Sequence, residues 1–341
     1  MDMQPIVSKL RSTVVPHPNF VLTHDRLFNL SAIAQPGSVI VVVGPTRVGK
    51  TYLSHELIKN LVDPKKQNGS STVPIARIEA STTDNGFIST RYILLQFLRA
   101  IRHPFYVDGG PIVRMRDTES TLRRQTVAGL SARGTEYLIV DEAHHLLRTK
   151  STRSAEGVLD SVKCLGNETG CIVIVIGGYE LLKYLFHSAH LNGRMTVLEF
   201  SNYGVDADDL REFDRLLVTL DEWLPWARGF SLYHFRDHIY EGSLGCYGQL
   251  VHWSLSALAE MQSQNCQRLK LRHFLATRRL EQVQTIKNDI ELGKSLLADF
   301  TLKRDKHEQA AVPVQSPIRR GKPFHRRPAR DPVGVRGQPH G

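Results

Sequence analysis

The feature of the sequence that most constrains its fold is an apolar run ending in a glycine-rich loop. Residues 39–43 are Val-Ile-Val-Val-Val, and the next eight are Gly44-Pro45-Thr46-Arg47-Val48-Gly49-Lys50-Thr51. A buried strand, a loop of this spacing and a following helix form the phosphate-binding P-loop pattern. The two glycines let successive backbone N–H groups surround phosphate oxygens, and the helix N-terminus favours negative charge. The sequence therefore predicts a nucleoside triphosphate site bound by Gly44, Pro45, Thr46, Arg47, Val48, Gly49, Lys50, Thr51 and Tyr52.

A second apolar run, residues 137–140, ends in the acids Asp141 and Glu142. A P-loop ATPase holds Mg²⁺ between the loop hydroxyl and an acid at such a strand end, so Thr51 and Asp141 are the predicted metal ligands. Lys50 is predicted to reach the β- and γ-phosphates, and Glu142 to polarise the attacking water. Alternatively, the two acids are solvated residues that start a helix over 143–147, since acids favour helix N-termini.

Apolar runs at 38–43, 73–79, 137–140, 171–176 and 196–200 are predicted strands. Helices are predicted between most of them, at 51–61, 89–101, 119–132, 155–168 and 179–186. Such alternation indicates an α/β fold with a parallel sheet flanked by helices. Beyond residue 206 only helices are predicted, near 208–220, 232–239, 249–264 and 271–298. The expected organisation is an N-terminal segment near the nucleotide site (1–37), a P-loop core (38–203), a helical lid (204–300) and a tail (301–341).

Composition favours a soluble globular protein. Apolar residues make up 41% of the 341-residue chain and charged residues 23%. No apolar run has the length of a bilayer span and the N-terminus does not resemble a signal peptide, so we expect a cytosolic protein with no membrane partner. The four cysteines have no zinc-like spacing and are expected to be reduced thiols.

The positive charge is concentrated at the C-terminus. The formal net charge is +10, and the segment 303–341 holds ten Lys or Arg against three acids, which leaves +3 for the rest. Proline, glycine and the lack of apolar periodicity predict that this tail is disordered. It is either a solvated terminus or a segment that contacts phosphates or a partner protein.

A P-loop, an acidic strand end and a helical lid are the layout of AAA+ ATPases, in which a neighbouring subunit supplies an arginine to the phosphates. Arg194 follows the fourth strand and its helix, where such an arginine finger belongs. An ordinary surface arginine is the alternative.

Over roughly residues 15–280 the sequence resembles one AAA+ subfamily, the TnsC and TniB type of ATPase regulators of heteromeric DNA transposons. An ordered series of segments carries the resemblance: 15–20, 25–27, 44–51, 74–80, 118–122, 132–146, 163–167 and 176–182. It implies an ATP- and Mg²⁺-dependent homo-oligomer, a ring or filament on double-stranded DNA. This assembly would link a TniQ-type target selector to the transposase, with hydrolysis as a timer.

Carried over by position, Lys50 and Thr51 would be the Walker A residues, Asp141 and Glu142 the Walker B acids, and Arg194 the intersubunit finger. Two residues depart from the family pattern. Gly178 stands where a threonine is common and Arg47 where a small residue is common, and the missing hydroxyl suggests slow hydrolysis. No sensor arginine is evident in 240–248.

DNA contact is assigned to Arg114 and Arg116, between the second strand and the Asp141 strand, with solvated surface charge as the alternative. Contacts to phosphates would be largely independent of sequence.

A superfamily 2 helicase needs a second RecA-like domain, for which the helical residues after 200 are too few, and a small-molecule kinase has little use for a basic tail. The other readings are an ATP-gated scaffold with little turnover and a helicase loader. Ring stoichiometry and the mode of targeting, CRISPR-guided or by a sequence-specific factor, are not encoded in recognisable motifs.

Overall fold

The computed structural model describes residues 3–12, 15–61, 71–81, 87–106, 117–147, 152–185 and 195–310, with the backbone alone at 152–156, 185 and 300–310. The chain forms two compact units, 1–300 and 301–341. The sheet, the candidate site and the side chains discussed below all lie in the first unit.

The centre of the first unit is a parallel sheet of five strands in the order β2-β3-β4-β1-β5. The strands are β1 (Val39–Val43), β2 (Ile75–Glu79), β3 (Tyr137–Asp141), β4 (Ile172–Gly177) and β5 (Met195–Glu199). All five match predicted strands, with ends that differ by at most two residues. The predicted parallel sheet is therefore confirmed.

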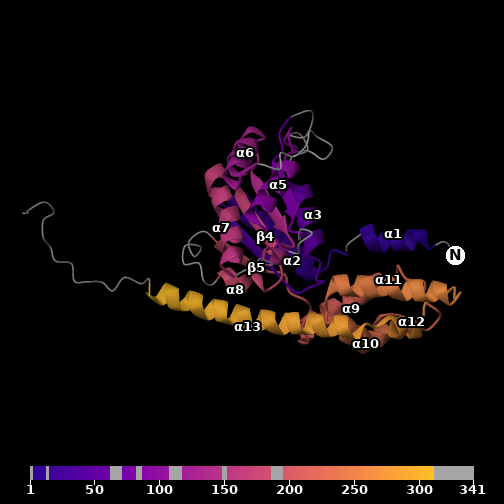
Figure 1. Ribbon diagram of the computed structural model, residues 1–341. Coiled ribbons are helices and arrows are strands. Elements are labelled where there is room, and N and C mark those ends of the chain that lie inside the picture. Colours follow the sequence, from indigo (N-terminus) through magenta and orange to yellow (C-terminus); the bar gives the residue numbers. More distant parts are fainter. Residues whose placement is uncertain are drawn as a thin grey trace, which may run out of the picture. The chain divides into compact units, whose positions relative to one another are not determined.

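Helices cover both faces of the sheet (Figure 1). On one face lie α5 (Thr90–Ala100), α6 (Glu119–Ala132) and α7 (Thr152–Thr169), and on the other α2 (Pro18–Ile33) and α3 (Lys50–Leu61). Successive β1 residues alternate between these layers: the odd-numbered valines pack on the first, and Ile40 and Val42 on the second. Because β1 is buried on both faces, its residues are all apolar, and this explains the continuous apolar run in the sequence.

Helices alone follow the sheet, as predicted. They are α9 (Ala207–Asp221), α10 (Arg236–Ser243), α11 (Tyr247–Ser263), α12 (Leu271–Thr277) and α13 (Leu280–Ala310). Most of them share a hydrophobic core of their own, separate from the two sheet layers, and Leu10 of α1 (Gln4–Ser12) joins it. In the described part of the chain, no helix has the length and apolarity to cross a membrane.

Two helix predictions in this part were wrong. The helix expected at 232–239 is a short 3₁₀ turn, η3 (Tyr233–Phe235), followed by α10. The continuous helix expected at 271–298 breaks between α12 and α13, where Arg278 adopts an extended conformation. The carbonyl of Phe274, which would continue the helical ladder, instead accepts hydrogen bonds from the Trp253 indole at 2.9 Å and the Thr277 hydroxyl at 3.2 Å.

The strand order decides which loops meet. In a parallel sheet all carboxyl ends lie at one edge, and ligands bind where neighbouring strands diverge. The loops after β1, β3 and β4 are adjacent in space because β4 lies between β1 and β3. The glycine-rich loop, the Asp141–Glu142 pair and Gly178 therefore share one edge of the sheet.

Candidate nucleotide-binding site

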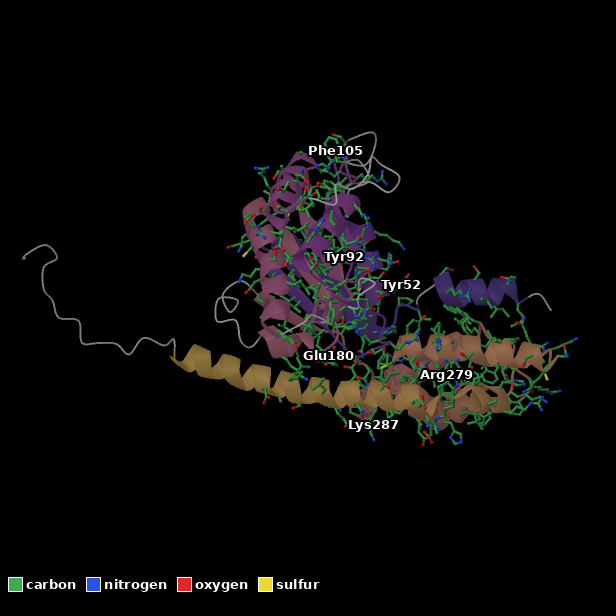
Figure 2. All side chains as sticks on the ribbon, viewed as in Figure 1. Tyr52, Tyr92, Phe105, Glu180, Arg279 and Lys287 are labelled. Atoms are coloured by element: carbon green, nitrogen blue, oxygen red, sulfur yellow. The ribbon has the colours of Figure 1, made fainter. Side chains whose placement is uncertain are left out.

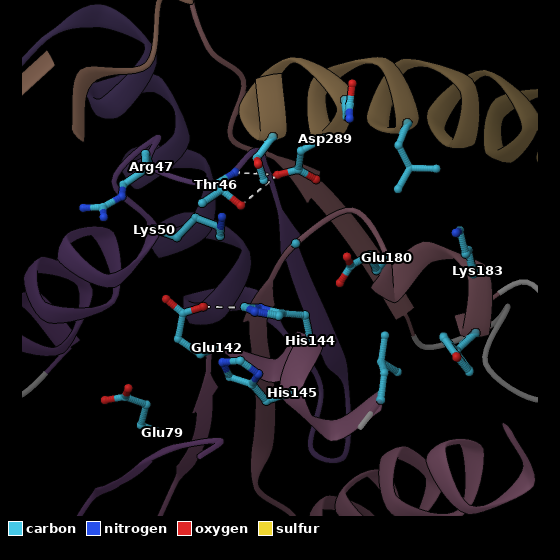
Figure 3. A pocket seen from close by; sticks show the side chains of 16 residues that line it. Thr46, Arg47, Lys50, Glu79, Glu142, His144, His145, Glu180, Lys183 and Asp289 are labelled. Atoms are coloured by element: carbon cyan, nitrogen blue, oxygen red, sulfur yellow. Dashed lines mark hydrogen bonds and ion pairs between the residues drawn. The ribbon is translucent and has the colours of Figure 1, made fainter. Parts of the chain in front are cut away.

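A cavity of about 930 Å³ opens at this edge (Figure 3). Its size suits a nucleotide, since ligand pockets usually enclose about 300–1,000 Å³. The walls come from the glycine-rich loop, the ends of β2, β3 and β4, and helix α13. They are formed by Thr46, Arg47, Lys50, Glu79, Glu142, His144, His145, Leu147, Gly178, Glu180, Lys183, Tyr184, Thr285, Asn288, Asp289 and Leu292.

The glycine-rich loop has the backbone that its sequence predicts. A side chain at Gly44 would place its Cβ 2.3 Å from the carbonyl oxygen of Phe200, so only glycine fits. Gly49 has a φ of 119°, which side chains rarely adopt. Arg47 has a φ of 67°, the left-handed region where a small residue is the easier choice. The Arg47 side chain extends away from Lys50 (Figure 3), and Val48 is buried.

Lys50 begins α3 and is almost fully buried beneath the loop. Its ammonium donates to the carbonyl oxygens of Gly44 at 2.9 Å and Pro45 at 2.8 Å. Burial lowers the pKa of Lys50, and the nearby acids Glu142 and Asp289 oppose that shift. The lysine is thus held by its own loop, at the floor of the cavity where a phosphate would compete for it.

Asp141, at the end of β3, is 1% exposed, and both of its carboxylate oxygens accept hydrogen bonds. One carboxylate oxygen accepts from Arg77 Nη2 at 2.7 Å and Ser54 Oγ at 3.1 Å, and the other accepts from the Glu142 amide at 2.9 Å. Arg77 lies on β2, directly beside β3 in the sheet. A guanidinium at this distance compensates the charge of the buried carboxylate. Without it, burying the carboxylate would cost several kcal/mol of folding free energy.

Glu142 faces the cavity from the strand tip. Its carboxylate accepts from the Thr51 hydroxyl at 3.4 Å and lies 3.3 Å from His144 Nδ1 (Figure 3). Glu142 has a φ of 50°, a strained conformation for a non-glycine residue that is characteristic of functional sites. The short segment that follows is the 3₁₀ turn η1 (Ala143–Leu147), where the alternative reading of the two acids expected a helix.

The described residues hold no group of three or more His, Cys, Asp or Glu arranged for a metal ion. Mg²⁺ keeps several waters and takes only one or two protein oxygens besides the substrate phosphates. The Thr51 hydroxyl donates to the carboxylate of Glu142, which lines the cavity, and Asp141 lies behind that wall and accepts from the Glu142 amide. The oxygens present fit that ion.

The end of β4 contributes two consecutive glycines with different constraints. A Cβ on Gly177 would lie 2.7 Å from Leu181 and 3.0 Å from the His144 amide nitrogen. A Cβ on Gly178 would meet its nearest neighbours, Glu180 and His144, at an ordinary 3.9 Å. The position for which the resemblance implies a threonine is therefore open to a larger side chain.

The helical part reaches the glycine-rich loop through two contacts. The Gln249 amide, at the start of α11, donates to the Arg47 carbonyl at 3.1 Å, and a Cβ on Gly248 would lie 2.6 Å from that same oxygen. From α13, Asp289 accepts from the Thr46 amide at 2.6 Å and the Thr46 hydroxyl at 3.0 Å. In 240–248, where no sensor arginine was found, the backbone of Gly248 packs against the loop, and the hydrogen bond comes from the next residue, Gln249.

An aromatic cluster lies behind the loop. The Tyr52 ring is 5.7 Å from Phe20 of α2, and Phe20 packs on Phe200 and on His17. His17 Nδ1 is 2.9 Å from the Tyr203 hydroxyl. The segment before β1 therefore contacts the residue that ends the predicted nucleotide-binding run.

Three predicted site residues, Arg194, Arg114 and Arg116, lie outside the described residues and stay predictions. Sequence reasoning missed Arg77, Ser54 and Asp289. Ser54 carried a weak signal, since it lies one helical turn after Lys50 and so on the same face of α3. Arg77 and Asp289 carried none, because their partners are 64 and 243 residues away in the chain.

Solved structures with a similar fold include two ORC structures. The Aeropyrum pernix ORC2 protein, in ADPNP and ADP complexes, superposes with a TM-score of 0.54 at 16% identity, over 79% of this chain and 70% of that chain. Drosophila ORC bound to DNA superposes with a TM-score of 0.51 at 15% identity, over 82% and 65%. Identities this low concern the fold alone, which is the α/β AAA+ fold expected from the sequence.

Among curated proteins none matches the sequence. The family model described as "Bacterial TniB protein" matches residues 13–204, which is more than half of the chain. That stretch contains the glycine-rich loop, Asp141, Glu142 and all five strands. The chain therefore belongs to the TniB family.

Proposed function

We propose that this TniB protein binds and hydrolyses ATP with Mg²⁺ at the cavity after β1, β3 and β4. The observation that carries the proposal is the convergence of Lys50 and Glu142, from two strand ends, on one cavity of nucleotide size, with the Thr51 hydroxyl 3.4 Å from the Glu142 carboxylate. Lys50 would leave the carbonyls of its own loop for the β- and γ-phosphates, and the loop amides would hold the remaining oxygens.

Mg²⁺ would be held by Thr51 with Asp141 and would neutralise charge on the β- and γ-phosphates. The Arg77 and Ser54 hydrogen bonds fix the orientation of the Asp141 carboxylate. Glu142 would accept a proton from the attacking water, and His144 at 3.3 Å would orient its carboxylate.

We further propose that ATP drives assembly of the protein on double-stranded DNA, as a regulator that links a TniQ-type target selector to a transposase. Family membership supports this proposal, because TniB-type proteins are transposition ATPases in the resemblance drawn above. Arg194 is the proposed finger between subunits, and Arg114 with Arg116 the proposed DNA contacts. Drosophila ORC, which has a similar fold, was solved bound to DNA.

Gly178 keeps a second possibility open, an ATP-gated scaffold with little turnover. The backbone at Gly178 borders the cavity and brings no hydroxyl to orient water. In that case ATP binding and assembly would persist, and phosphate release would be slow.

Electron microscopy with double-stranded DNA tests the proposal, comparing no nucleotide, ATP with Mg²⁺, and a non-hydrolysable analogue. Lys50→Ala should lose ATP binding by at least about tenfold, together with assembly, because charge-assisted contacts to phosphate are lost. Lys59→Ala is the matched control, since Lys59 lies on the same helix with its side chain 66% exposed. Glu142→Gln should trap ATP-bound assemblies.

Three outcomes would count against the proposal. ATP-dependent assemblies from Lys50→Ala would show that the loop is not the nucleotide site. Rapid disassembly of Glu142→Gln would remove the catalytic role of Glu142. Assembly on single-stranded DNA alone would favour a helicase loader.

A further inference from the structure

Helix α13 places a carboxylate on the phosphate-binding loop. Asp289 Oδ2 accepts hydrogen bonds from both the amide and the hydroxyl of Thr46 (Figure 3). Thr46 is the third residue of the eight-residue loop, and its amide opens into the cavity. A negatively charged oxygen at 2.6 Å from a loop amide is the arrangement that such loops use to bind a phosphate oxygen.

The Asp289 carboxylate and a bound triphosphate would compete for the same groups, the loop amides and the Lys50 ammonium. Asp289 and Lys50 both line the cavity, and Asp289 acts to raise the pKa of Lys50 against the lowering caused by burial. Glu79, Glu142 and Glu180 add three more acids to the same walls, which also carry the cations Arg47 and Lys183. A triphosphate can therefore bind the loop only when Asp289 moves away, because the Asp289 carboxylate and a phosphate this close in a partly buried cavity would repel each other strongly.

Asp289 lies on the inward face of α13, and that face is closely packed. Ile286 is 2% exposed, and a Cβ on Gly293 would lie 2.4 Å from the ring of Tyr179. Leu296 and Leu297 pack against the core on one face of the sheet. These residues are three or four positions apart, so they form one side of the helix.

The opposite side of α13 faces solvent. Lys287 is exposed, and in Figure 2 it lies across the helix from Glu180 of the cavity. Asp289 itself is half-buried at the edge of the cavity, and a shift of α13 would carry its carboxylate away from Thr46. The close contact at Gly293 makes that shift a change between two packings.

We propose that Asp289 is an autoinhibitory latch: it occupies the phosphate loop of the empty protein, and ATP displaces it and releases α13. This inference rests on the proposed function and adds its regulation. Helix α13 leads directly into the Arg- and Pro-rich C-terminal segment. Nucleotide occupancy is thereby transmitted to the part of the chain that carries most of the net positive charge.

The test compares wild type with Asp289→Asn, which keeps the shape of the side chain and removes its charge. Asp299→Asn is the matched control, the same change at an exposed position on the same helix. Two quantities are measured: amide hydrogen exchange of 44–48 and 283–297 without nucleotide, and affinity for ATP with Mg²⁺. Exchange in the first segment reports the Thr46 amide directly, whether or not ATP binds.

In Asp289→Asn we expect exchange without nucleotide to rise several-fold in both segments and ATP affinity to tighten about tenfold, because a charge-assisted bond is replaced by a neutral one. In wild type, ATP should raise exchange in 283–297. Asp299→Asn should match wild type. Unchanged exchange and affinity in Asp289→Asn would overturn the latch.

Failure of the proposed function gives a different pattern. If neither wild type nor Asp289→Asn binds ATP, the cavity is not a nucleotide site, and the regulatory role of Asp289 falls with it. If both bind ATP equally well while exchange of 283–297 stays constant, nucleotide binding stands and the latch alone is refuted.

Discussion

Acidification should destabilise this protein through one buried histidine, His17. Its ring is 4% exposed and packs among Phe20, Phe200, Tyr203 and Tyr247. Its Nδ1 accepts a hydrogen bond from the Phe20 amide at 3.4 Å and lies 2.9 Å from the Tyr203 hydroxyl. The other ring nitrogen, Nε2, is buried without a hydrogen-bond partner among the described residues. The folded environment therefore suits neutral imidazole and not its cation.

Burial lowers the pKa of His17 from 6.5 to about 4. The unfolded chain then binds a proton that the folded chain does not, so stability is fully present above about pH 6.5 and falls as the pH drops toward 4. For these two pKa values, linkage gives a loss of about 2 kcal/mol in unfolding free energy between about pH 7.5 and about pH 5. The loss levels off below the folded pKa.

Urea denaturation at the two pH values measures this loss. The reference is His17→Phe, which keeps a ring in the aromatic cluster and cannot titrate. That variant will be less stable at both pH values, since it leaves the Phe20 amide and Tyr203 hydroxyl without their acceptor. Its pH dependence should nevertheless be smaller by about 2 kcal/mol, and this difference removes contributions from other histidines. Equal pH dependence in the two proteins would refute the reasoning.

Three further predictions concern the site. Arg77→Met should cost about 3 kcal/mol in urea denaturation, because it leaves the buried Asp141 carboxylate without its cation, and adding Asp141→Asn should recover most of that loss. Gly178→Ser should leave the free energy of unfolding within about 0.5 kcal/mol of wild type. Gly177→Ser should lower it by about 1–3 kcal/mol, because a side chain at 177 meets close neighbours and one at 178 does not. Equal thermal unfolding temperatures of the two variants would contradict this. Gly248→Ala should weaken the contact between α11 and the glycine-rich loop and raise amide exchange in 44–48, with unchanged exchange as the contrary result.

Much of the fold could be predicted because its signals are local. The three inner strands, β1, β3 and β4, are runs of consecutive apolar residues up to their last residue, and burial on both faces requires that pattern. The glycine-rich loop also follows from local chemistry, since Gly44 and Gly49 are required by a close carbonyl and a positive φ. The helix pattern after residue 206 was readable as periodicity, but its break at Arg278 was not, because Trp253 from another helix takes the carbonyl there.

The N-terminal helices α1 and α2 were not predicted as helices. Their apolar residues are divided between two cores: Leu10 packs with the C-terminal helices and Leu27 with the sheet. Arg194, Arg114 and Arg116 were chosen by their order in the chain, and they stay predictions.

By itself the sequence determined the phosphate loop, the acidic strand end and the α/β class, because each depends on residues adjacent in the chain. Only the tertiary structure decided what these groups contact. The pairing of β2 with β3 places Arg77 on Asp141, and the packing of α13 places Asp289 on Thr46. The physical reason is that charge and hydrogen bonding act over a few ångströms in space, and the chain returns to the same point only after 64 or 243 residues.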